Sequence, residues 1–234
     1  MNIVVICPMK VELEAVINNA TNPIKKEYKY ISGYEFETKL GNVFAFEAGI
    51  GKTNMGFDLA YINSIKHIDR VICLGVAGGI KDFIHQLDIV IATKVAYHDV
   101  DATAFGDKYV LGQLPGNELY FKADEEFISK LDNYKDDINH SKLYKGLIIT
   151  GDQFATANNM PMTLINKFDD PYAVDMESAA VGQICTRLNI PFNIIRSISD
   201  CIYKPESQQV NTYNNFEKLS ANQASKILFY LLNN

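Results

Sequence analysis

The chain has 234 residues, of which 47% are hydrophobic and 21% are charged, a balance that is typical of folded globular proteins and excludes general disorder. A net charge of −6 excludes the strongly basic surface that binds nucleic acids or anionic membranes, so neither is expected as a partner. No apolar run approaches the roughly 20 residues that cross a bilayer, and the first residues lack the basic segment of a signal peptide, so we expect a cytoplasmic protein.

Short apolar, β-branched runs alternate with segments in which apolar residues have helical spacing. In chain order, the pattern predicts a strand at 3–7, a helix at 10–19, a strand at 43–48, a helix at 53–67, strands at 71–75, 88–93, 147–150 and 172–176, a helix at 177–188, a strand at 192–198 and a helix at 216–232. This alternation predicts a three-layer α/β fold, with a central, mixed but mostly parallel, twisted sheet between helices. The chain has no internal repeat and no flexible linker, so residues 1–234 are expected to form a single domain.

Two long polar segments interrupt this alternation. Residues 97–122 combine aromatic residues and glycines with few helix or strand signals, and residues 201–215 are predicted to form a surface loop. Long irregular segments within a compact domain are usually functional or disordered. The aromatic residues favour a functional role for both.

Charged residues and glycines, with one phenylalanine, collect where the predicted strands end. They are Glu12 after the first strand, Gly75, Gly78 and Gly79 after 71–74, Asp152 and Phe154 after 147–150, Glu177 after 172–176, and Arg196 and Asp200 at the end of the last strand. Any single acid at such a place is explained by the dipole of the helix that follows. Because ligands of open α/β sheets bind beyond the carboxyl ends of the strands, five such ends together predict a binding site.

Several motifs that would indicate a cofactor or a metal are incomplete. The stretch 49–53, GIGKT, lacks the first glycine of a P-loop, because Phe46 stands at that position, and no G-x-G-x-x-G is present. The four histidines, among them His98, have no paired spacing, and the four cysteines stand singly. We therefore expect no cofactor, no metal and buried free thiols.

Eight segments resemble the 5′-methylthioadenosine/S-adenosylhomocysteine nucleosidases, which have the nucleoside phosphorylase fold. They are MKVELEA at 9–15, AGIGKTNMG at 48–56, GVAGGI at 75–80, YHDVDATAFG at 97–106, GQLPG at 112–116, GLIITGDQF at 146–154, AVDMESAA at 173–180 and IPFNIIRSISD at 190–200. They occur in the order of the family and span most of the chain.

The resemblance implies a hydrolase that cleaves the N-glycosidic bond of 5′-methylthioadenosine and S-adenosylhomocysteine, with 5′-deoxyadenosine as a further substrate, in nucleoside catabolism and methionine salvage. Asp200 matches the general acid at adenine N7, and Glu12 matches the residue that activates water. Glu177 matches the carboxylate at the ribose hydroxyls. Arg196 resembles the neighbour that keeps Glu12 ionised.

The resemblance also implies the residues that bind the substrate. Phe154 is expected to stack on adenine, with main-chain groups at 154–155 reading its edge. The other residues of the implied pocket are Met9, Ile50, Val76, Ala77, Ala155, Met176 and Tyr213. In the family, the loop that contains TAFG crosses a homodimer interface, so Phe105 is expected to complete the site of a partner subunit. The segment 201–215 is expected to act as a lid.

The chain departs from the family pattern at three positions. Val76 replaces the usual serine, Asp175 replaces the first glutamate of Glu-Met-Glu, and Ala155 replaces the usual isoleucine. Valine has no hydroxyl to donate or accept a hydrogen bond. For Asp175, strand alternation leaves a supporting or helix-capping role as the simplest interpretation.

Three alternatives remain open at this point. A purine nucleoside phosphorylase shares the fold but binds phosphate, usually through several arginines, and this chain has no arginine before Arg70. A non-catalytic nucleoside-binding protein would need no acid and base on opposite faces. A nucleosidase for another purine nucleoside would differ only in the pocket for the 5′ substituent.

Overall fold

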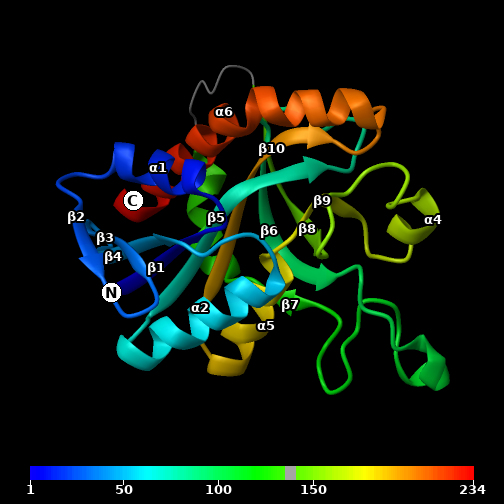
Figure 1. The fold of residues 1–234 in the computed structure, drawn as a ribbon, viewed down its shortest axis with the longest axis horizontal. Helices are drawn as coiled ribbons and strands as arrows, with labels where there is room; N and C mark the ends of the chain where they lie inside the picture. The colour runs from blue at the N-terminus through cyan, green and yellow to red at the C-terminus, as the bar shows by residue number, and fades with distance from the viewer. Residues whose placement is uncertain (135–140) are drawn as a thin grey trace.

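A computed structural model describes residues 1–134 and 141–234, and in this part of the chain ten strands form one sheet (Figure 1). The strands are β1 Asn2–Cys7, β2 Ile24–Glu27, β3 Ser32–Thr38, β4 Gly41–Glu47, β5 Arg70–Gly79, β6 Ile89–Tyr97, β7 Phe121–Lys122, β8 Leu143–Thr150, β9 Pro171–Asp175 and β10 Phe192–Cys201. The helices are α1 Lys10–Asn19, α2 Lys52–Ile65, η1 Thr103–Lys108, α3 Glu125–Ser129, η2 Lys130–Asn133, α4 Met162–Ile165, α5 Ser178–Leu188 and α6 Glu206–Asn233.

The strands lie in the order β10-β6-β8-β9-β5-β1-β4-β3-β2, and β7 pairs with β6. The central pairings β4–β1–β5–β10 and β6–β8–β9 are parallel, whereas β2–β3–β4, β10–β6 and β5–β9 are antiparallel. Because β10 also pairs with β5, the strands β5, β10, β6, β8 and β9 close on themselves. The predicted mixed, mostly parallel sheet is confirmed.

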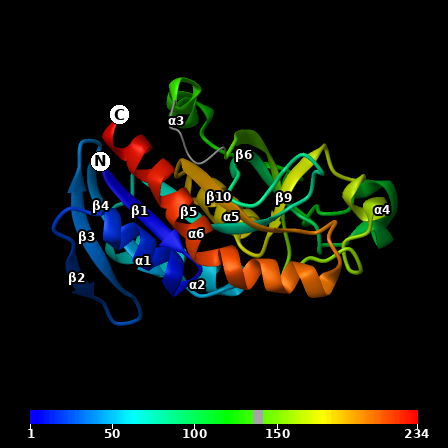
Figure 2. The ribbon, with the colours of Figure 1, turned by 90° about the horizontal axis from the view of Figure 1, so that it is seen from above.

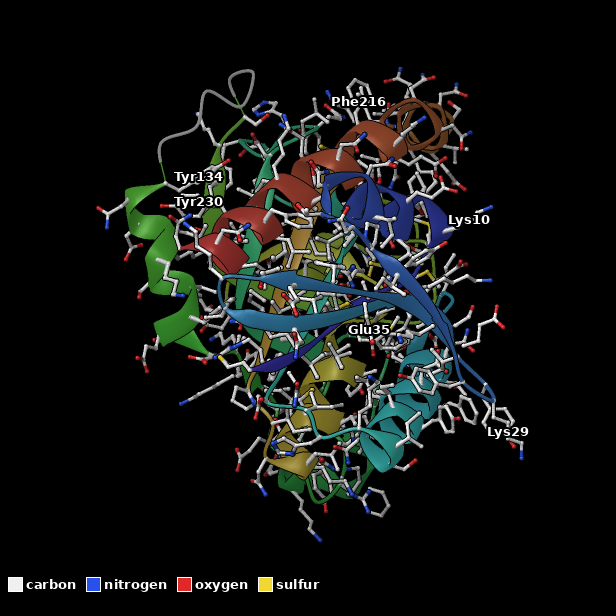
Figure 3. The ribbon with its side chains drawn as sticks, turned by 90° about the vertical axis from the view of Figure 1, so that its left-hand side faces the viewer. Lys10, Lys29, Glu35, Tyr134, Phe216 and Tyr230 are labelled. Carbon is white, nitrogen blue, oxygen red and sulfur yellow. The ribbon has the colours of Figure 1, made fainter. Side chains whose placement is uncertain are left out.

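Helices cover both faces of the sheet, as the three-layer prediction requires. Along β1, Val4 and Ile6 pack into the core beneath α2 and α5, while Ile3 and Val5 pack into the core beneath α1 and α6. This alternation follows from the two-residue period of a strand. Figure 2 shows α1 and α6 on one face, and in Figure 3 the sheet separates them from α2 and α5.

The helix α6 corrects the prediction for residues 201–215. Only residues 202–205 form a turn, and the helix begins at Glu206 after Pro205, ten residues before the predicted start. The first ten residues are polar and rich in asparagine, which competes with helical backbone hydrogen bonds, so the sequence gives a weak helix signal. Tertiary contacts decide the outcome, because Gln209 is fully buried.

At its other end α6 packs against η2, where the rings of Tyr230 and Tyr134 are 4.6 Å apart (Figure 3).

No helix among the described residues is long and apolar enough to cross a membrane. The four cysteines are free and buried, as predicted.

The hairpin β2–β3 is the largest element that the sequence did not predict. β2, IKKE, is largely exposed, whereas β3, SGYEFET, is partly buried, and both mix charged with apolar residues without a clear two-residue period. It extends the sheet at the edge far from the predicted site. Residues 97–122 contain only η1 and short strand ends, in line with the expected irregular segment.

Candidate active site

A cavity of about 200 Å³ opens at the carboxyl ends of β1, β5, β9 and β10. Ten of the residues predicted from the sequence line it: Met9, Ile50, Val76, Ala77, Phe154, Ala155, Met176, Glu177, Asp200 and Tyr213. Glu12 and Arg196 are buried behind this lining, at 1% and 0% exposure. The structure therefore brings together all predicted site residues except Phe105.

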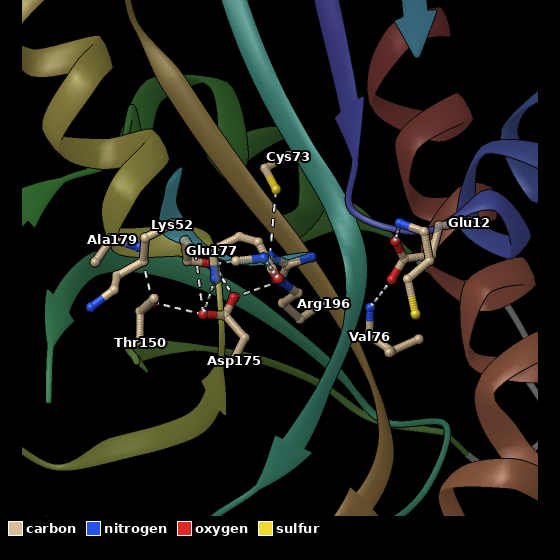
Figure 4. A network of polar contacts seen from close by, with 12 residues as sticks. Glu12, Lys52, Cys73, Val76, Thr150, Asp175, Glu177, Ala179 and Arg196 are labelled. Atoms are coloured by element: carbon tan, nitrogen blue, oxygen red, sulfur yellow. Dashed lines mark hydrogen bonds and ion pairs between the residues drawn. The ribbon is translucent and has the colours of Figure 1, made fainter. Parts of the chain in front are cut away.

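Arg196 is the cation at the centre of the site (Figure 4). Its Nε donates to Asp175 Oδ2 at 2.8 Å, and its Nη2 donates to Glu177 Oε2 at 3.3 Å and to Cys73 Sγ at 3.4 Å. Burial alone would disfavour the charge, but the surrounding anions raise the pKa of Arg196. A buried guanidinium that is paired in this way remains charged and fixed in place.

Glu12 is held from two sides by backbone N–H groups (Figure 4). Met9 N donates to Oε2 at 2.7 Å, and Val76 N donates to Oε1 at 2.9 Å. Burial raises the pKa of Glu12 to about 8, although Arg196 and both hydrogen bonds act in the opposite direction. Arg196 thus favours the ionised form of Glu12, which is the expected direction, while burial acts against it. The ion pairs of Arg196 go to Asp175 and Glu177, and its role toward Glu12 stays a prediction.

Gly75 provides the space in which Glu12 and Arg196 approach each other. A Cβ atom at this glycine would lie 2.1 Å from Arg196 Nη1 and 2.6 Å from Glu12 Oε1. Nη1 has no hydrogen-bond partner within the described residues. A buried donor and a carboxylate that face the same small space suit a water molecule that both can hold.

Glu177 lies where β9 leads into α5, and its carboxyl group points into the site. Its Oε1 accepts a hydrogen bond from Gly51 N at 3.0 Å, and its Oε2 faces Arg196. Burial raises the pKa of Glu177 to about 7, against the attraction of Arg196. Glu177 lines the cavity and can interact with a polar ligand there.

Asp175 supports its neighbours, as the simplest interpretation of the sequence predicted. Its Oδ1 accepts from Thr150 Oγ1 at 2.6 Å and from the N–H groups of Glu177 and Ser178 at 3.3 and 3.2 Å, at the start of α5. Its Oδ2 accepts from Arg196 and from Ser178 Oγ. Asp175 thus fixes both the helix start and the guanidinium.

Asp200 ends the regular part of β10, directly after a break in the β5 pairing between Ile198 and Asp200. Its Oδ1 accepts from Ser199 Oγ at 2.7 Å, and its Oδ2 accepts from Gln209 Nε2 at 2.7 Å. Burial raises the pKa of Asp200, while these two hydrogen bonds lower it. A carboxyl group with a raised pKa can donate a proton near neutral pH.

The two acids border the same stretch of β5. Glu12 lies beside Gly75 and Val76, while a Cβ at Gly78 would be 3.4 Å from Asp200 Oδ2. Because a strand rises by about 3.3 Å per residue, the positions of β5 that the two acids contact lie roughly 7–10 Å apart along the strand. Val76 and Gly78 both line the cavity, so the acid and the base border the same ligand space.

The remaining wall of the cavity is apolar and aromatic. The rings of Phe154 and Tyr213 meet edge to face with centroids 5.7 Å apart, and Phe154 is 41% exposed. Tyr213 Oη donates to Met9 Sδ at 3.2 Å. An open aromatic face beside a thioether suits a flat heteroaromatic ligand with an apolar substituent.

Phe105 lies outside the cavity, in η1, with 72% of its surface exposed. Its ring packs edge to face against Tyr109. The role of Phe105 in a partner's site stays a prediction.

Several further residues belong to the site and were not predicted from the sequence. Pro8, Gln153, Val174 and Ser199 line the cavity, Thr150 and Ser178 hold Asp175, and Gln209 binds Asp200. Most of them adjoin a predicted site residue in sequence, and that proximity is the one signal available. Gln209 had no such signal, because it lies in the first turn of α6, which the sequence did not predict to be helical.

Metal ligands do not converge in the described ranges, 1–134 and 141–234, since no group of three His, Cys, Asp or Glu side chains is arranged to hold an ion. His98 and Asp99 instead lie beside Gly151, and Asp99 pairs with Lys52. A larger hollow of about 610 Å³ lies beside β1–β4, and its lining residues include no pair of buried acids like Glu12 and Asp200.

A family model described as the phosphorylase superfamily matches residues 2–233. A 5′-methylthioadenosine/S-adenosylhomocysteine nucleosidase from Anoxybacillus flavithermus (strain DSM 21510 / WK1) is 34% identical over 233 residues, covering 100% of this chain and 98% of that protein. Two solved structures of proteins with that description are also similar. The one from S. pneumoniae, with the transition-state inhibitor MT-ImmA, has a TM-score of 0.89 and 30% identity and covers 99% of this chain and 98% of its own. The one from Colwellia psychrerythraea 34H, with adenine, has a TM-score of 0.90 and 30% identity and covers 99% of this chain and 94% of its own.

Proposed function

Because the chain belongs to the 5′-methylthioadenosine/S-adenosylhomocysteine nucleosidase family of the phosphorylase superfamily, we propose that it hydrolyses the N-glycosidic bond of both nucleosides. The products are adenine and the 5′-substituted ribose. The observation that carries this proposal is the placement of Glu12 and Asp200 at contacts along one stretch of β5, whose residues Val76 and Gly78 line the cavity. Direct attack by water needs an acid and a base on either side of the bond that breaks.

In the proposed reaction, Asp200 donates a proton to N7 of adenine, and the base leaves as a neutral molecule. Water between Glu12 and Arg196 Nη1 attacks the anomeric carbon while Glu12 takes a proton from it. The bond that breaks is the one between that carbon and the purine nitrogen, and the electron pair stays with the base. Burial raises the pKa of Asp200, which supports its role as the proton donor. Glu12 accepts a proton only in its ionised form, which Arg196 favours; because burial raises the pKa of Glu12 to about 8, this form is a stronger base than an ordinary carboxylate.

Glu177 is proposed to bind the ribose hydroxyls and to stabilise the positive charge that develops on the sugar. Its carboxylate is fixed from behind by Gly51 N and Arg196, which supports a role in positioning. Arg196 holds Glu177 and Asp175, and its free Nη1 is available to orient the water.

The valine at position 76 is compatible with this mechanism. Its backbone N–H supplies the contact that holds Glu12 Oε1, and that contact needs no side-chain hydroxyl. The loss of the family's serine therefore leaves the proposed base in position.

The 5′ side of the substrate is proposed to lie against Met9, Ile50, Met176 and Tyr213. The Tyr213–Met9 contact supports an apolar, polarisable surface for a thioether. Such a surface has no group that requires sulfur, so 5′-deoxyadenosine is proposed as a further substrate. We also propose that the enzyme is a homodimer of single-domain subunits, in which Phe105 completes the partner's site; the exposure of Phe105 supports this.

A phosphorylase is the main competing function, and the charges of the site argue against it. Phosphate needs unpaired cations, whereas Arg196 is already paired with Asp175 and Glu177. A phosphate at the position of the proposed water would also face Glu12.

Adenine release from 5′-methylthioadenosine, measured with and without phosphate, tests the proposal. We expect equal rates in both conditions, and a rate at least about 1,000-fold lower for Asp200→Asn, which cannot donate the proton. Asp132→Asn removes a carboxylate from an exposed ion pair and serves as the matched control with an unchanged rate. Strict dependence on phosphate would contradict hydrolysis, and full activity of Asp200→Asn would contradict the assigned acid.

A further inference from the structure

Gln209 connects two acceptors of the proposed purine site. Its Nε2 donates to Asp200 Oδ2 at 2.7 Å and to the backbone carbonyl of Ala155 at 2.6 Å. The residue is 0% exposed, and its Oε1 has no hydrogen-bond partner in the described part of the chain. One planar NH₂ group thus uses both of its hydrogens to join the proposed general acid to the main chain beside Phe154.

A 6-aminopurine presents the same donor arrangement. If N7 of adenine receives a proton from Asp200, the 6-amino group on the same edge lies next to that carboxyl group. Its two hydrogens then point to acceptors on either side, which are Asp200 Oδ2 and the carbonyl of Ala155. An exocyclic amine and a side-chain carboxamide both carry two coplanar N–H donors.

A 6-amino group that binds these two acceptors would approach the amide of Gln209, which already binds both of them. The cavity measures about 200 Å³, below the roughly 300–1,000 Å³ of sites for drug-sized ligands. Both oxygens of Asp200 already accept hydrogen bonds, one from Ser199 on β10 and one from Gln209 on α6. Ser199 is part of the sheet, so Gln209 is the donor that can leave.

We infer that Gln209 competes with the 6-amino group of the purine for Asp200 and the Ala155 carbonyl, so that substrate binding exchanges one NH₂ donor for another. This inference rests on the proposed function, because it takes adenine as the base. The unpaired Oε1 supports it, since a buried carbonyl oxygen without a partner makes the inward position of Gln209 costly.

Gln209 lies in the first turn of α6, so its departure releases one of the contacts that hold this turn to the site. A second contact holds the same turn, because Asn158 Nδ2 donates to Glu206 Oε2 at 2.8 Å on the surface. The 6-amino group replaces Gln209 as the donor to Asp200 Oδ2, so the number of hydrogen bonds to this carboxyl group is kept in the exchange.

Calorimetric binding of adenine to wild type, Gln209→Ala and Gln208→Ala tests the inference. Gln208 is the exposed neighbour in the same helical turn, so its variant is the matched control. Removing the competitor should tighten adenine binding by on the order of tenfold in Gln209→Ala, with no change in Gln208→Ala. The KM for the nucleoside should fall by a similar factor while kcat does not rise.

Gln209→Leu keeps the bulk without a donor and should shift binding in the same direction, so the test does not depend on the alanine variant folding. In a crystal structure with adenine, the 6-amino group should lie between Asp200 and Ala155, with Gln209 displaced. Unchanged or weaker adenine binding in both variants, or adenine bound beside an undisplaced Gln209, would overturn the inference and leave the proposed hydrolysis intact. A protein that neither binds adenine nor releases it from the nucleoside would overturn both.

Discussion

Glu12, Glu177 and Asp200 share one physical condition, since burial raises the pKa of each carboxyl group. An ordinary surface glutamate is ionised at neutral pH and could neither share nor exchange a proton there. Arg196 limits the shift at Glu12 and Glu177 without cancelling it. The site therefore binds protons more strongly than ordinary carboxylates do, which suits the proposed acid Asp200, whereas Glu12 accepts a proton in the ionised form that Arg196 favours.

The raised pKa of Glu12 predicts a pH-dependent stability difference from Glu12→Gln. Between its ordinary pKa of 4.5 and about 8, the folded wild type binds a proton that the unfolded chain has released, so rising pH lowers the stability of the wild type. Glutamine does not titrate. In urea unfolding, the variant should gain about 3 kcal/mol relative to wild type between pH 5 and pH 8.

Glu14→Gln provides the control for this measurement. Glu14 lies in the same helix, but its side chain is 58% exposed and pairs only with Lys10 at 3.7 Å. Its difference from wild type should stay nearly constant over the same pH range. A constant difference for Glu12→Gln as well would show that Glu12 titrates normally in the folded protein.

At the scale of elements, β5 organises the site because its last residues have small side chains or none. Gly75 makes room for Glu12 and Arg196, and Gly78 lies against Asp200. A strand with larger residues here would push the acid and the base away from the cavity.

Gly75→Ala should therefore disrupt the site. Its Cβ would overlap with Arg196 Nη1, and Arg196 is completely buried and paired with Asp175, so it has little freedom to move. We expect a loss of about 1–3 kcal/mol in unfolding free energy and about 100-fold in kcat/KM.

Gly56→Ala is the matched control, because nothing lies within 4 Å of a Cβ added at this glycine in α2. Alanine favours the helix by roughly 0.5–1 kcal/mol, so this variant should be at least as stable as wild type and fully active. Normal activity of Gly75→Ala would mean that Glu12 and Arg196 need not approach each other.

At the scale of the whole molecule, the exposed Phe105 leads to a test of the proposed homodimer. Phe105→Ala should raise KM about tenfold if the ring completes a partner's site, with little change in melting temperature because the ring is exposed in the monomer. Co-expression with Asp200→Asn should restore activity, since a mixed dimer has one site with both Asp200 and Phe105. Activity that merely averages the two variants would contradict a shared site.

The sequence by itself determined the layered α/β fold, the positions of most central strands and the set of acids at their ends. These features depend on local apolar periods and on residue types that follow buried strands. It also indicated the family, through segments such as 97–106 and 190–200.

Only the tertiary structure decided which charges pair and how far α6 extends. Arg196 binds Asp175 and Glu177 more directly than Glu12, because β9 and β10 place these carboxylates closest to it. The polar start of α6 is helical because Gln209 is buried against Asp200. Desolvation and long-range contacts of this kind arise between segments that are distant in sequence, so no local pattern can encode them.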